Sequence, residues 1–279
     1  MIPIEPRHPT PIAEFLREVQ WPVMPEVGQA LIRSLSDEDT DTMVICRIIR
    51  KDPALTATLL RMANSALFGL SGQIDTLERA VHVVGLALIR ARAVSICMAR
   101  GVSLPAGMDR TAFWRYSMLC AGYAQWLADL CDVDDQEAWL AGMMLRLGEV
   151  TLGQVQPLAM ARIAAAAPGL CGERWLRERQ AVGFDEGQIT AELAQHWDFP
   201  PALVHGLRYA AFPLESPKFF KLAAVLHVAG WLADLERVTP DTVAQLPLLV
   251  LKLLALSPEQ LLDDPPDPDQ LADITMFQG

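Results

Sequence analysis

The sequence has no pair of cysteines or histidines at a spacing typical of metal binding. It contains five cysteines and five histidines in 279 residues, and no two cysteines form a C-x-x-C pair. The scattered thiols argue against both a zinc knuckle and a disulfide framework. We expect free, buried cysteines, because an unpaired thiol in a reducing compartment behaves as a small hydrophobe. His82 and His227 lie in apolar segments and are predicted to be core histidines.

Basic residues are in the minority, since 23 lysines and arginines face 34 acidic residues and the net charge is -11. This balance disfavours direct binding to nucleic acid and to an anionic membrane surface. The longest apolar run, residues 222–235, contains His227 and Asp234 and is too short to span a bilayer. The first fifteen residues lack the apolar run of a signal peptide. The predicted location is therefore cytoplasmic.

Strand patterns and phosphate-binding glycine loops are also missing. No alternating β-branched stretch, Asn-Gly hairpin, or G-x-x-x-x-G-K-[ST] loop is present. Helical spacing is frequent instead, as at Val27, Leu31 and Leu35. Residues 77–98 are predicted to form one helix, interrupted only by Gly85. With 52% hydrophobic residues the chain can bury a large core, and we predict an all-α fold.

Proline and glycine mark the boundaries between helical regions. The segment 102–109, VSLPAGMD, excludes a continuous helix. We expect an N-terminal extension, two helical blocks, and a C-terminal helix with an acidic Pro-rich tail, at residues 1–20, 21–107, 108–235 and 236–279. The tail sequence DDPPDPDQ predicts an extended or disordered chain.

One conspicuous segment, KDPALTATLLRMANSALFG, begins and ends with helix-boundary residues. Asp can cap a helix that starts with Pro, and Asn, Ser and Gly suit its C-terminal turn. The residues concerned are Asp52, Pro53, Asn64, Ser65, Phe68 and Gly69. We interpret them as structural, and a direct partner contact through Asn64 or Phe68 is the alternative.

The same segment lies in an ordered series that carries a family resemblance. The series reads PVMPEVGQALIRSLSDED, IIRKDPALTATLLRMANSALFG, IDTLERAVHVVGLALIR and RAVSICMARG. It resembles the N-terminal half of the HDOD domain, a bacterial signalling domain related to the HD phosphohydrolases. The resemblance covers roughly residues 14–235 and implies an HD-domain-like helical bundle with an N-terminal helical subdomain.

The related hydrolases hold divalent metals with histidines and aspartates from several helices, and the resemblance locates those positions here. FWRYS and AGMMLRLGEV, with Gly148 retained, resemble the segments that carry the first ligands. The six positions hold Tyr116, Leu145, Arg146, Glu186, Tyr209 (beside Ala210) and Gly230. Leucine cannot ligate a metal and arginine repels a cation, while Tyr116 and Glu186 alone do not make a hard-metal site. We therefore expect no catalytic residue, no metal and no cofactor.

The resemblance implies a non-enzymatic signal-transduction module, alone or as the output part of a response regulator. Its expected partners are signalling proteins with receiver, diguanylate-cyclase or phosphodiesterase domains, and the groove between the two blocks is the expected contact surface. One alternative is a small-molecule or nucleotide sensor, because Arg146 in the vestigial pocket can hold an anion unless it pairs with Glu149. The third hypothesis is that the chain is a metal-dependent phosphohydrolase. The sequence leaves the oligomeric state open.

Overall fold

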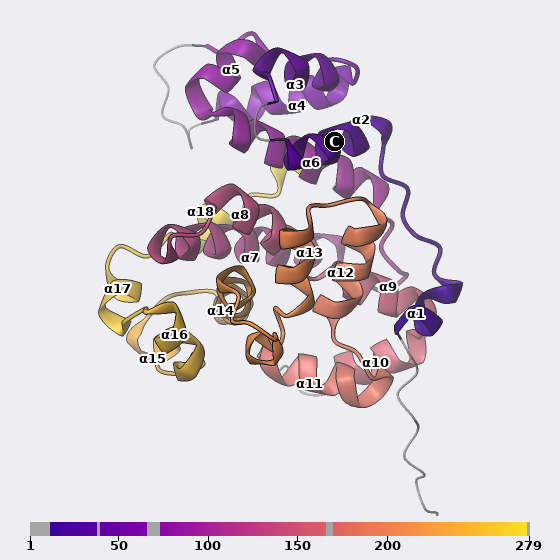
Figure 1. Cartoon of the computed structure of the whole chain (residues 1–279), viewed down its shortest axis with the longest axis vertical. Helices are drawn as coiled ribbons and strands as arrows, with labels where there is room; N and C mark the ends of the chain where they lie inside the picture. The colour runs from indigo at the N-terminus through magenta and orange to yellow at the C-terminus, as the bar shows by residue number, and fades with distance from the viewer. Residues whose placement is uncertain (1–11, 38–39, 66–72, 166–169, 278–279) are drawn as a thin grey trace, which may run out of the picture.

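The computed structural model describes residues 12–37, 40–65, 73–165 and 170–277. Every regular element within these ranges is a helix, so the predicted all-α fold class is confirmed. Figure 1 shows an upper block of helices resting on a larger lower block, with the C-terminal helices at one side. Among the described residues no single helix has the length and apolar composition needed to cross a bilayer. One bent pair of helices, Leu77–Val84 and Leu86–Gly101, has that length and composition only when the two are taken together.

Among the described residues, the chain up to Gly101 contains the helices of the upper block and the two short helices that precede it. They are α1 (Ile12–Phe15), η1 (Leu16–Glu18), α2 (Glu26–Arg33), η2 (Ser34–Ser36), α3 (Thr42–Ile49), α4 (Pro53–Ala63), α5 (Leu77–Val84) and α6 (Leu86–Gly101). The prediction of one helix over residues 77–98 is wrong. Gly85 has φ +93°, a conformation closed to most residues, and α5 and α6 meet there at 117°.

The boundaries of α4 follow the capping chemistry of its sequence. Asp52 accepts a hydrogen bond from the Leu55 backbone N–H at 2.9 Å, and Pro53 occupies the first turn. At the other end the Asn64 side chain donates to the Leu60 and Ile74 carbonyls and accepts from the Ile74 N–H. The Ser65 N–H donates to the Met62 carbonyl. Phe68 and Gly69 lie outside the described residues.

The lower block and the C-terminal region follow a connection at residues 102–109. The lower block comprises α7 (Arg110–Cys131), α8 (Asp135–Met144), α9 (Leu147–Val155), α10 (Pro157–Ala165), α11 (Cys171–Val182), α12 (Glu186–His196), α13 (Pro201–Arg208), η4 (Pro213–Glu215) and α14 (Lys221–Leu235). The C-terminal region comprises α15 (Pro240–Val243), α16 (Leu248–Leu254), α17 (Pro258–Leu262), α18 (Pro268–Leu271) and η5 (Thr275–Phe277). Helices α7, α8 and α14 pack together at the centre.

One hydrophobic core crosses the boundary between the blocks. It runs from Ile49 and Leu59 in the upper block through Trp139 on α8 to Leu226 on α14, all at most 2% exposed. All five cysteines are free and buried, as predicted. His227 is buried and binds the Ala210 carbonyl at 2.9 Å. His82, by contrast, is exposed, so its prediction as a core histidine is wrong: it lies on the outer face of α5.

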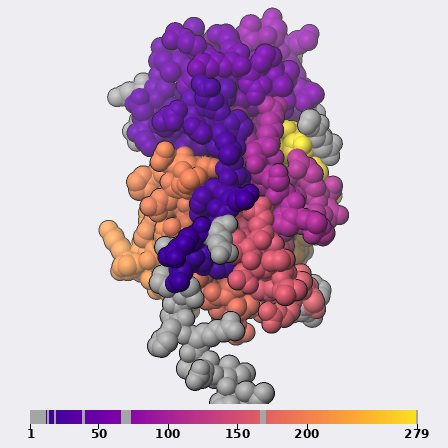
Figure 2. Space-filling view, turned by 90° about the vertical axis from the view of Figure 1, so that its right-hand side faces the viewer, coloured from indigo at the N-terminus to yellow at the C-terminus, as the bar shows by residue number. Residues whose placement is uncertain are grey.

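The two ends of the described chain both tie the blocks together. Residues 12–21 run from the upper block over the lower one (Figure 2), where Leu16 packs with Leu152 and Ile189 in a second small core. At the other end, α18 packs on α7 and η5 packs on α4 and α6. The prediction of an extended or disordered tail over DDPPDPDQ, residues 263–270, is wrong for residues 268–270, which lie in α18. Asp267 caps a turn that begins with Pro268, and the Leu271 side chain covers α7.

Candidate functional site

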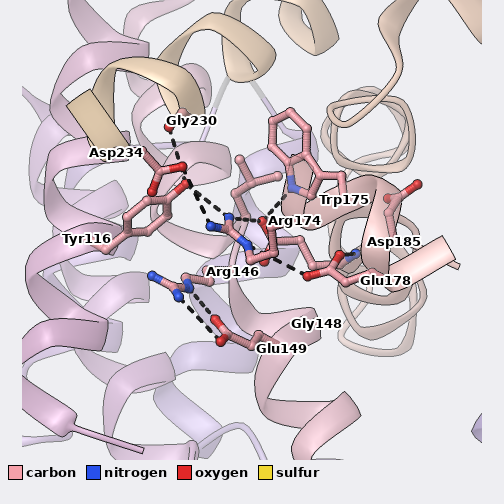
Figure 3. Close-up of polar contacts among 12 residues, drawn as sticks. Tyr116, Arg146, Gly148, Glu149, Arg174, Trp175, Glu178, Asp185, Gly230 and Asp234 are labelled. Atoms are coloured by element: carbon pink, nitrogen blue, oxygen red, sulfur yellow. Dashed lines mark hydrogen bonds and ion pairs between the residues drawn. The ribbon is translucent and has the colours of Figure 1, made fainter. Parts of the chain in front are cut away.

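The six positions that the resemblance assigns to metal ligands lie on α7, α12 and α14 and at helix ends. Tyr116 is on α7, Leu145 and Arg146 lie between α8 and α9, Glu186 begins α12, Tyr209 ends α13, and Gly230 is on α14. Figure 3 shows that several of them gather around an arginine from α11, Arg174. Sequence reasoning had not identified this side chain.

Arg174 is surrounded by acidic and phenolic groups. Its Nη2 donates to Glu186 Oε1 at 2.8 Å and to the Tyr116 hydroxyl at 3.4 Å. Its Nη1 lies 3.6 Å from Asp234 Oδ2, and its Nε lies 3.7 Å from Glu178 Oε1. The Arg174 side chain is only 9% exposed. A guanidinium therefore occupies the space between three carboxylates contributed by three helices.

Arg146 forms a second charged pair beside Arg174. Its guanidinium contacts Glu149 on the next turn, with Nη2 3.3 Å from Oε1, and its Cζ lies 4.5 Å from the centre of the Tyr116 ring. The Tyr116 hydroxyl in turn donates to the Gly230 carbonyl at 3.4 Å. The sequence left open whether Arg146 pairs with Glu149 or is available to an anion, and the structure shows the pairing with Glu149. We call Tyr116, Arg146, Glu149, Arg174, Glu178, Glu186 and Asp234 the arginine cluster.

Three of the six positions are not members of this cluster: Gly230, whose carbonyl contacts it through Tyr116, and Leu145 and Tyr209. Leu145 is fully buried, and its carbonyl accepts a hydrogen bond from Thr190 Oγ1 at 3.0 Å. Tyr209 packs its ring 4.8 Å from the His205 ring instead. Leu145 thus contributes to core packing, and Tyr209 lies at the C-terminal end of α13.

The start of α12 holds Glu186 in place. Trp175 Nε1 donates to Glu186 Oε1 at 2.7 Å, and the Glu186 N–H donates to Glu178 Oε2 at 2.7 Å. Asp185 caps the helix and pairs with Arg179 at 2.8 Å. A Cβ at Gly148 would lie 2.1 Å from the Glu186 carbonyl oxygen, so only glycine fits there. The backbone and the side chain of Glu186 are therefore fixed from several directions.

Burial and mutual charge together raise the pKa of one base and two acids of the cluster, Arg174, Glu178 and Asp234. Burial disfavours the charged form of Arg174, but Glu186, Tyr116 and Asp234 outweigh it and raise its pKa well above the usual value. Burial, followed by the charge of Glu186, raises the pKa of Glu178 well above that of a free glutamate. Burial likewise raises the pKa of Asp234. The arginines thus stay charged, while the carboxylates compete for them.

The residues of the cluster do not fit a divalent metal. Glu178 Oε1 and Asp234 Oδ2 lack a hydrogen-bond partner among the described residues, as metal ligands would, but both lie at ion-pair distance from Arg174. Positive charge is thus already supplied by a guanidinium, which stays protonated and repels a second cation. The described residues contain no group of three or more His, Cys, Asp or Glu arranged to hold a metal ion.

A cavity of about 460 Å³ lies beside the cluster, at the connection between the two blocks. The connecting residues 105–109 form one wall, and Arg146 and Glu149 reach it from the side of the cluster. Phe113 and Met160 add apolar surface. Of the six positions assigned by the resemblance, Arg146 is the one that lines this cavity.

Sequence reasoning missed Arg174, Glu178 and Asp234 because it searched only the positions of metal ligands. One signal was present in the segment CGERWLRERQ. Arg174 and Glu178 are four residues apart, and they share a helix face with Cys171 and Trp175, which are apolar and buried. When two oppositely charged residues lie on the same helix face as the apolar residues, they indicate a buried ion pair.

Comparison with known proteins places the chain in context. Residues 21–213 match the HDOD domain. The structure is similar to that of a Shewanella amazonensis SB2B protein named as a candidate phosphohydrolase, with TM-score 0.74, 27% identity, and 94% of both chains covered. It also shares its fold with a Geobacter sulfurreducens HDOD domain protein of unknown function, with TM-score 0.70, 18% identity, and 92% and 90% covered.

A curated relative from Treponema pallidum (strain Nichols), called an uncharacterized protein, is 23% identical over 247 residues. The match covers 86% of this chain but only 47% of that protein, so the chain spans about half the length of this relative. The HDOD match extends over well more than half of the sequence, from the upper block to the end of α13. The chain belongs to the HDOD domain family.

Proposed function

We propose that this chain is a non-enzymatic signalling module that acts through contacts with other proteins. The observation that carries the proposal is the position of Arg174 among Glu178, Glu186 and Asp234. In the related hydrolases a metal ion held by histidines and aspartates activates the attacking water. Here a guanidinium neutralises the carboxylates instead, and it has no coordination site for water and lowers no water pKa.

A module of this kind needs a surface that changes with its conformation. The two blocks share one core, and they are joined by the connection at residues 102–109 and by both ends of the described chain. A change in how the blocks pack would alter the groove between them, and such crevices commonly collect ligands and partners. We propose this groove as the contact surface. Arg110 begins α7 directly after the connection and Gln154 contacts the Ser103 carbonyl of that connection, and both residues are exposed.

The charge of the chain favours one kind of partner. At a net charge of -11 it attracts a protein with a basic or mixed face, and the association rate should fall as salt rises. We propose signalling proteins with receiver, diguanylate-cyclase or phosphodiesterase domains as partners, the classes that the HDOD resemblance implies. Direct nucleic-acid and membrane binding are not part of the proposal.

The experiment begins with capture of partners from the native cell, followed by binding measurements on purified pairs. Two double variants are compared with the wild type. Arg110→Glu with Gln154→Lys alters the groove, and Arg146→Ala with Tyr116→Ala alters the cluster. We expect the groove variant to weaken binding at least about tenfold, because Gln154→Lys adds a cation that repels a basic group and Arg110→Glu reverses a charge that an acidic group on a mixed face would pair with. Loss of binding in the cluster variant alone would refute the groove.

A ligand sensor is the second candidate function, because the 460 Å³ cavity opens directly onto Arg146 and Glu149. An anionic ligand there would compete with Glu149 for the guanidinium. Loss of partner binding in the cluster variant alone would favour this sensor.

The phosphohydrolase reading has a direct test. Protein purified without chelator and then incubated with Mn²⁺ or Fe²⁺ is expected to retain no stoichiometric metal in elemental analysis. About one metal ion per chain, lost in Glu186→Gln, together with hydrolysis of a generic phosphodiester, would replace the proposal with an enzyme.

A further inference from the structure

A second cavity, of about 520 Å³, lies where the upper block, the lower block and the C-terminal segment meet. Helices α4 and α6 line it from the upper block, and α7 and α8 line it from the lower block. Residues 266–276 form the remaining wall. None of its lining residues belongs to the arginine cluster or to the 460 Å³ cavity. It is therefore a separate site.

Arg92 on α6 gives this cavity a cation without a counter-ion. Its Cζ lies 3.3 Å from the centre of the Trp139 ring, so the guanidinium stacks on the indole. Its Nη2 makes only a 3.5 Å contact with Gln125 Oε1, and its Nη1 has no hydrogen-bond partner among the described residues. The described part of the chain also offers Arg92 no carboxylate within 4.0 Å.

Asp267 and Asp273 line the cavity, and the charge of Asp135 acts on Arg92, but all three accept hydrogen bonds from groups other than Arg92. Asp267 accepts from the Asp269 N–H at 3.1 Å, and Asp273 accepts from the Thr275 N–H at 2.9 Å. Asp135 accepts from the side chains of Gln125 and Gln136. Burial lowers the pKa of Arg92 to about 9, against the opposing charge of Asp135. The charged guanidinium is thus left under-compensated, and an anion would stabilise it.

The other walls of the cavity carry both apolar and polar side chains, the polar ones being Thr58, Ser65, Gln125, Asp267, Gln270, Asp273 and Thr275. Met62, Met118 and Met276 line it together with Leu271 from α18. Methionine side chains adjust to ligands of varied shape because they are unbranched and polarizable. Arg61 adds a second cation at the rim, where it is exposed. The cavity thus combines the half-buried guanidinium of Arg92 with a patch of methionine and leucine side chains.

We propose that this cavity binds a small amphipathic anion, whose carboxylate or phosphate group is held by Arg92 and whose apolar body lies against the methionines. The ligand would contact both blocks and the C-terminal segment at once. This inference does not depend on the signalling role. It predicts that the protein has a ligand site distinct from the vestigial metal pocket.

The test uses the fluorescent dye 1-anilinonaphthalene-8-sulfonate, a flat apolar anion, with the full chain. Its uncharged analogue N-phenyl-1-naphthylamine has the same aromatic body without the sulfonate. We expect saturable binding of one sulfonate dye per chain. Arg92→Gln should raise the dissociation constant of the sulfonate dye at least about tenfold, as for loss of a charge-assisted contact. The uncharged dye should change by less than about threefold, because it lacks the group that Arg92 would hold.

Two further variants make the result decisive. Gln270→Trp fills the cavity from the exposed C-terminal wall and leaves Arg92 intact, so it should abolish binding of both dyes even if Arg92→Gln fails to fold. Arg146→Gln lies at the other cavity and should change neither. The proposal is overturned if Gln270→Trp leaves sulfonate-dye binding unchanged, or if Arg146→Gln weakens it as much as Arg92→Gln does.

Displacement of the bound dye then assigns the anion. Octanoate presents a carboxylate on an apolar chain, and adenosine monophosphate presents a phosphate on a flat base. Displacement by octanoate identifies carboxylates as the ligand class, and displacement by the nucleotide identifies phosphates. If neither displaces the dye at millimolar concentration, the assignment to small amphipathic anions is wrong.

Discussion

The regions around Arg174 and Arg92 each enclose a guanidinium within the protein, but the groups that surround it differ. Arg174 lies among three carboxylates and a phenol, and its pKa is raised well above the usual value. Arg92 stacks on Trp139 with no carboxylate paired to it in the described structure, and its pKa falls to about 9. The first arginine completes a closed charge cluster, whereas the second leaves a cation beside a cavity.

This difference shows that the region of Arg174, at the former metal site, is already filled by charged groups, whereas the region of Arg92 has room for a ligand. In the arginine cluster the cation lies at ion-pair distance from three acids, so a further charged ligand would have to displace a pair that is already formed. At Arg92 the same guanidinium chemistry lines a cavity of about 520 Å³. The resemblance to the fold family identifies the region of Arg174 as the former metal site. The cation beside a cavity, unpaired among the described residues, identifies the region of Arg92 as a candidate ligand site.

The largest expected effect that sharpens this comparison is that of Arg174→Met. It leaves Glu178, Glu186 and Asp234 buried without their shared cation, and breaking a buried charged pair in this way costs about 3–5 kcal/mol of stability. Urea denaturation of wild type and variant at pH 7 measures the difference. A change below about 1 kcal/mol would mean that the carboxylates are protonated in the folded protein and need no cation.

The acid response of the same region should be nearly as large. His227 packs 5.2 Å from the Trp175 ring, and burial lowers its pKa to about 4. Between pH 6.5 and 4 the folded protein therefore binds fewer protons than the unfolded chain, so its stability falls as the pH falls. The full effect is about 3 kcal/mol, from about 1.4 kcal/mol for each pKa unit.

The variant His227→Gln isolates this contribution from that of the carboxylates. Its free energy of unfolding, relative to that of the wild type, should rise as the pH is lowered from 7 to 4.5. Parallel stability curves for the two proteins would show that His227 is protonated without cost in the folded state.

The sequence predicted the fold better than the site. Helical periodicity, with capping residues such as Asp52 and Pro53, was sufficient for an all-α fold, because these signals are local. The turn at Gly85 was missed, since apolar spacing continues on both sides of it. The order of the C-terminal segment was also missed, because it depends on Leu271 packing against Gly122, a contact distant in sequence.

For the site, the motif positions located Tyr116, Arg146 and Glu186, which the structure brings together with Arg174. The replacement of metal chemistry by Arg174 could not be read from those positions. It depends on α11 packing beside α14, which places Arg174 and Asp234 within 3.6 Å across 60 residues of sequence. A pattern that compares single positions with a family motif does not detect a substitute that comes from another helix.

A smaller effect is expected for Arg92→Met, the counterpart of Arg174→Met. The variant loses the stacking on Trp139, which contributes about 0.5–2 kcal/mol, but it leaves no paired carboxylate behind and removes an incompletely solvated charge. We expect a net change within about 1 kcal/mol in urea denaturation. A loss comparable to that of Arg174→Met would show that Arg92 has a structural counter-ion, and the comparison between the two regions would fail.

The smallest effect is expected for Glu178→Gln, and its dependence on pH is the informative part. The amide oxygen still accepts the hydrogen bond from the Glu186 N–H, so the change at neutral pH should be within about 1 kcal/mol. Burial and the charge of Glu186 raise the folded-state pKa of Glu178 above 4.5, so the folded wild type binds more protons than the unfolded chain just above that pH. Raising the pH therefore destabilises the wild type but not the variant. Relative to the wild type, Glu178→Gln should gain stability as the pH rises from 5 to 7.5, the direction opposite to that of His227→Gln. If the variant instead loses about 2 kcal/mol or more at pH 7.5, Glu178 is an ionised partner of Arg174, and the cluster is more evenly balanced in charge than its burial indicates.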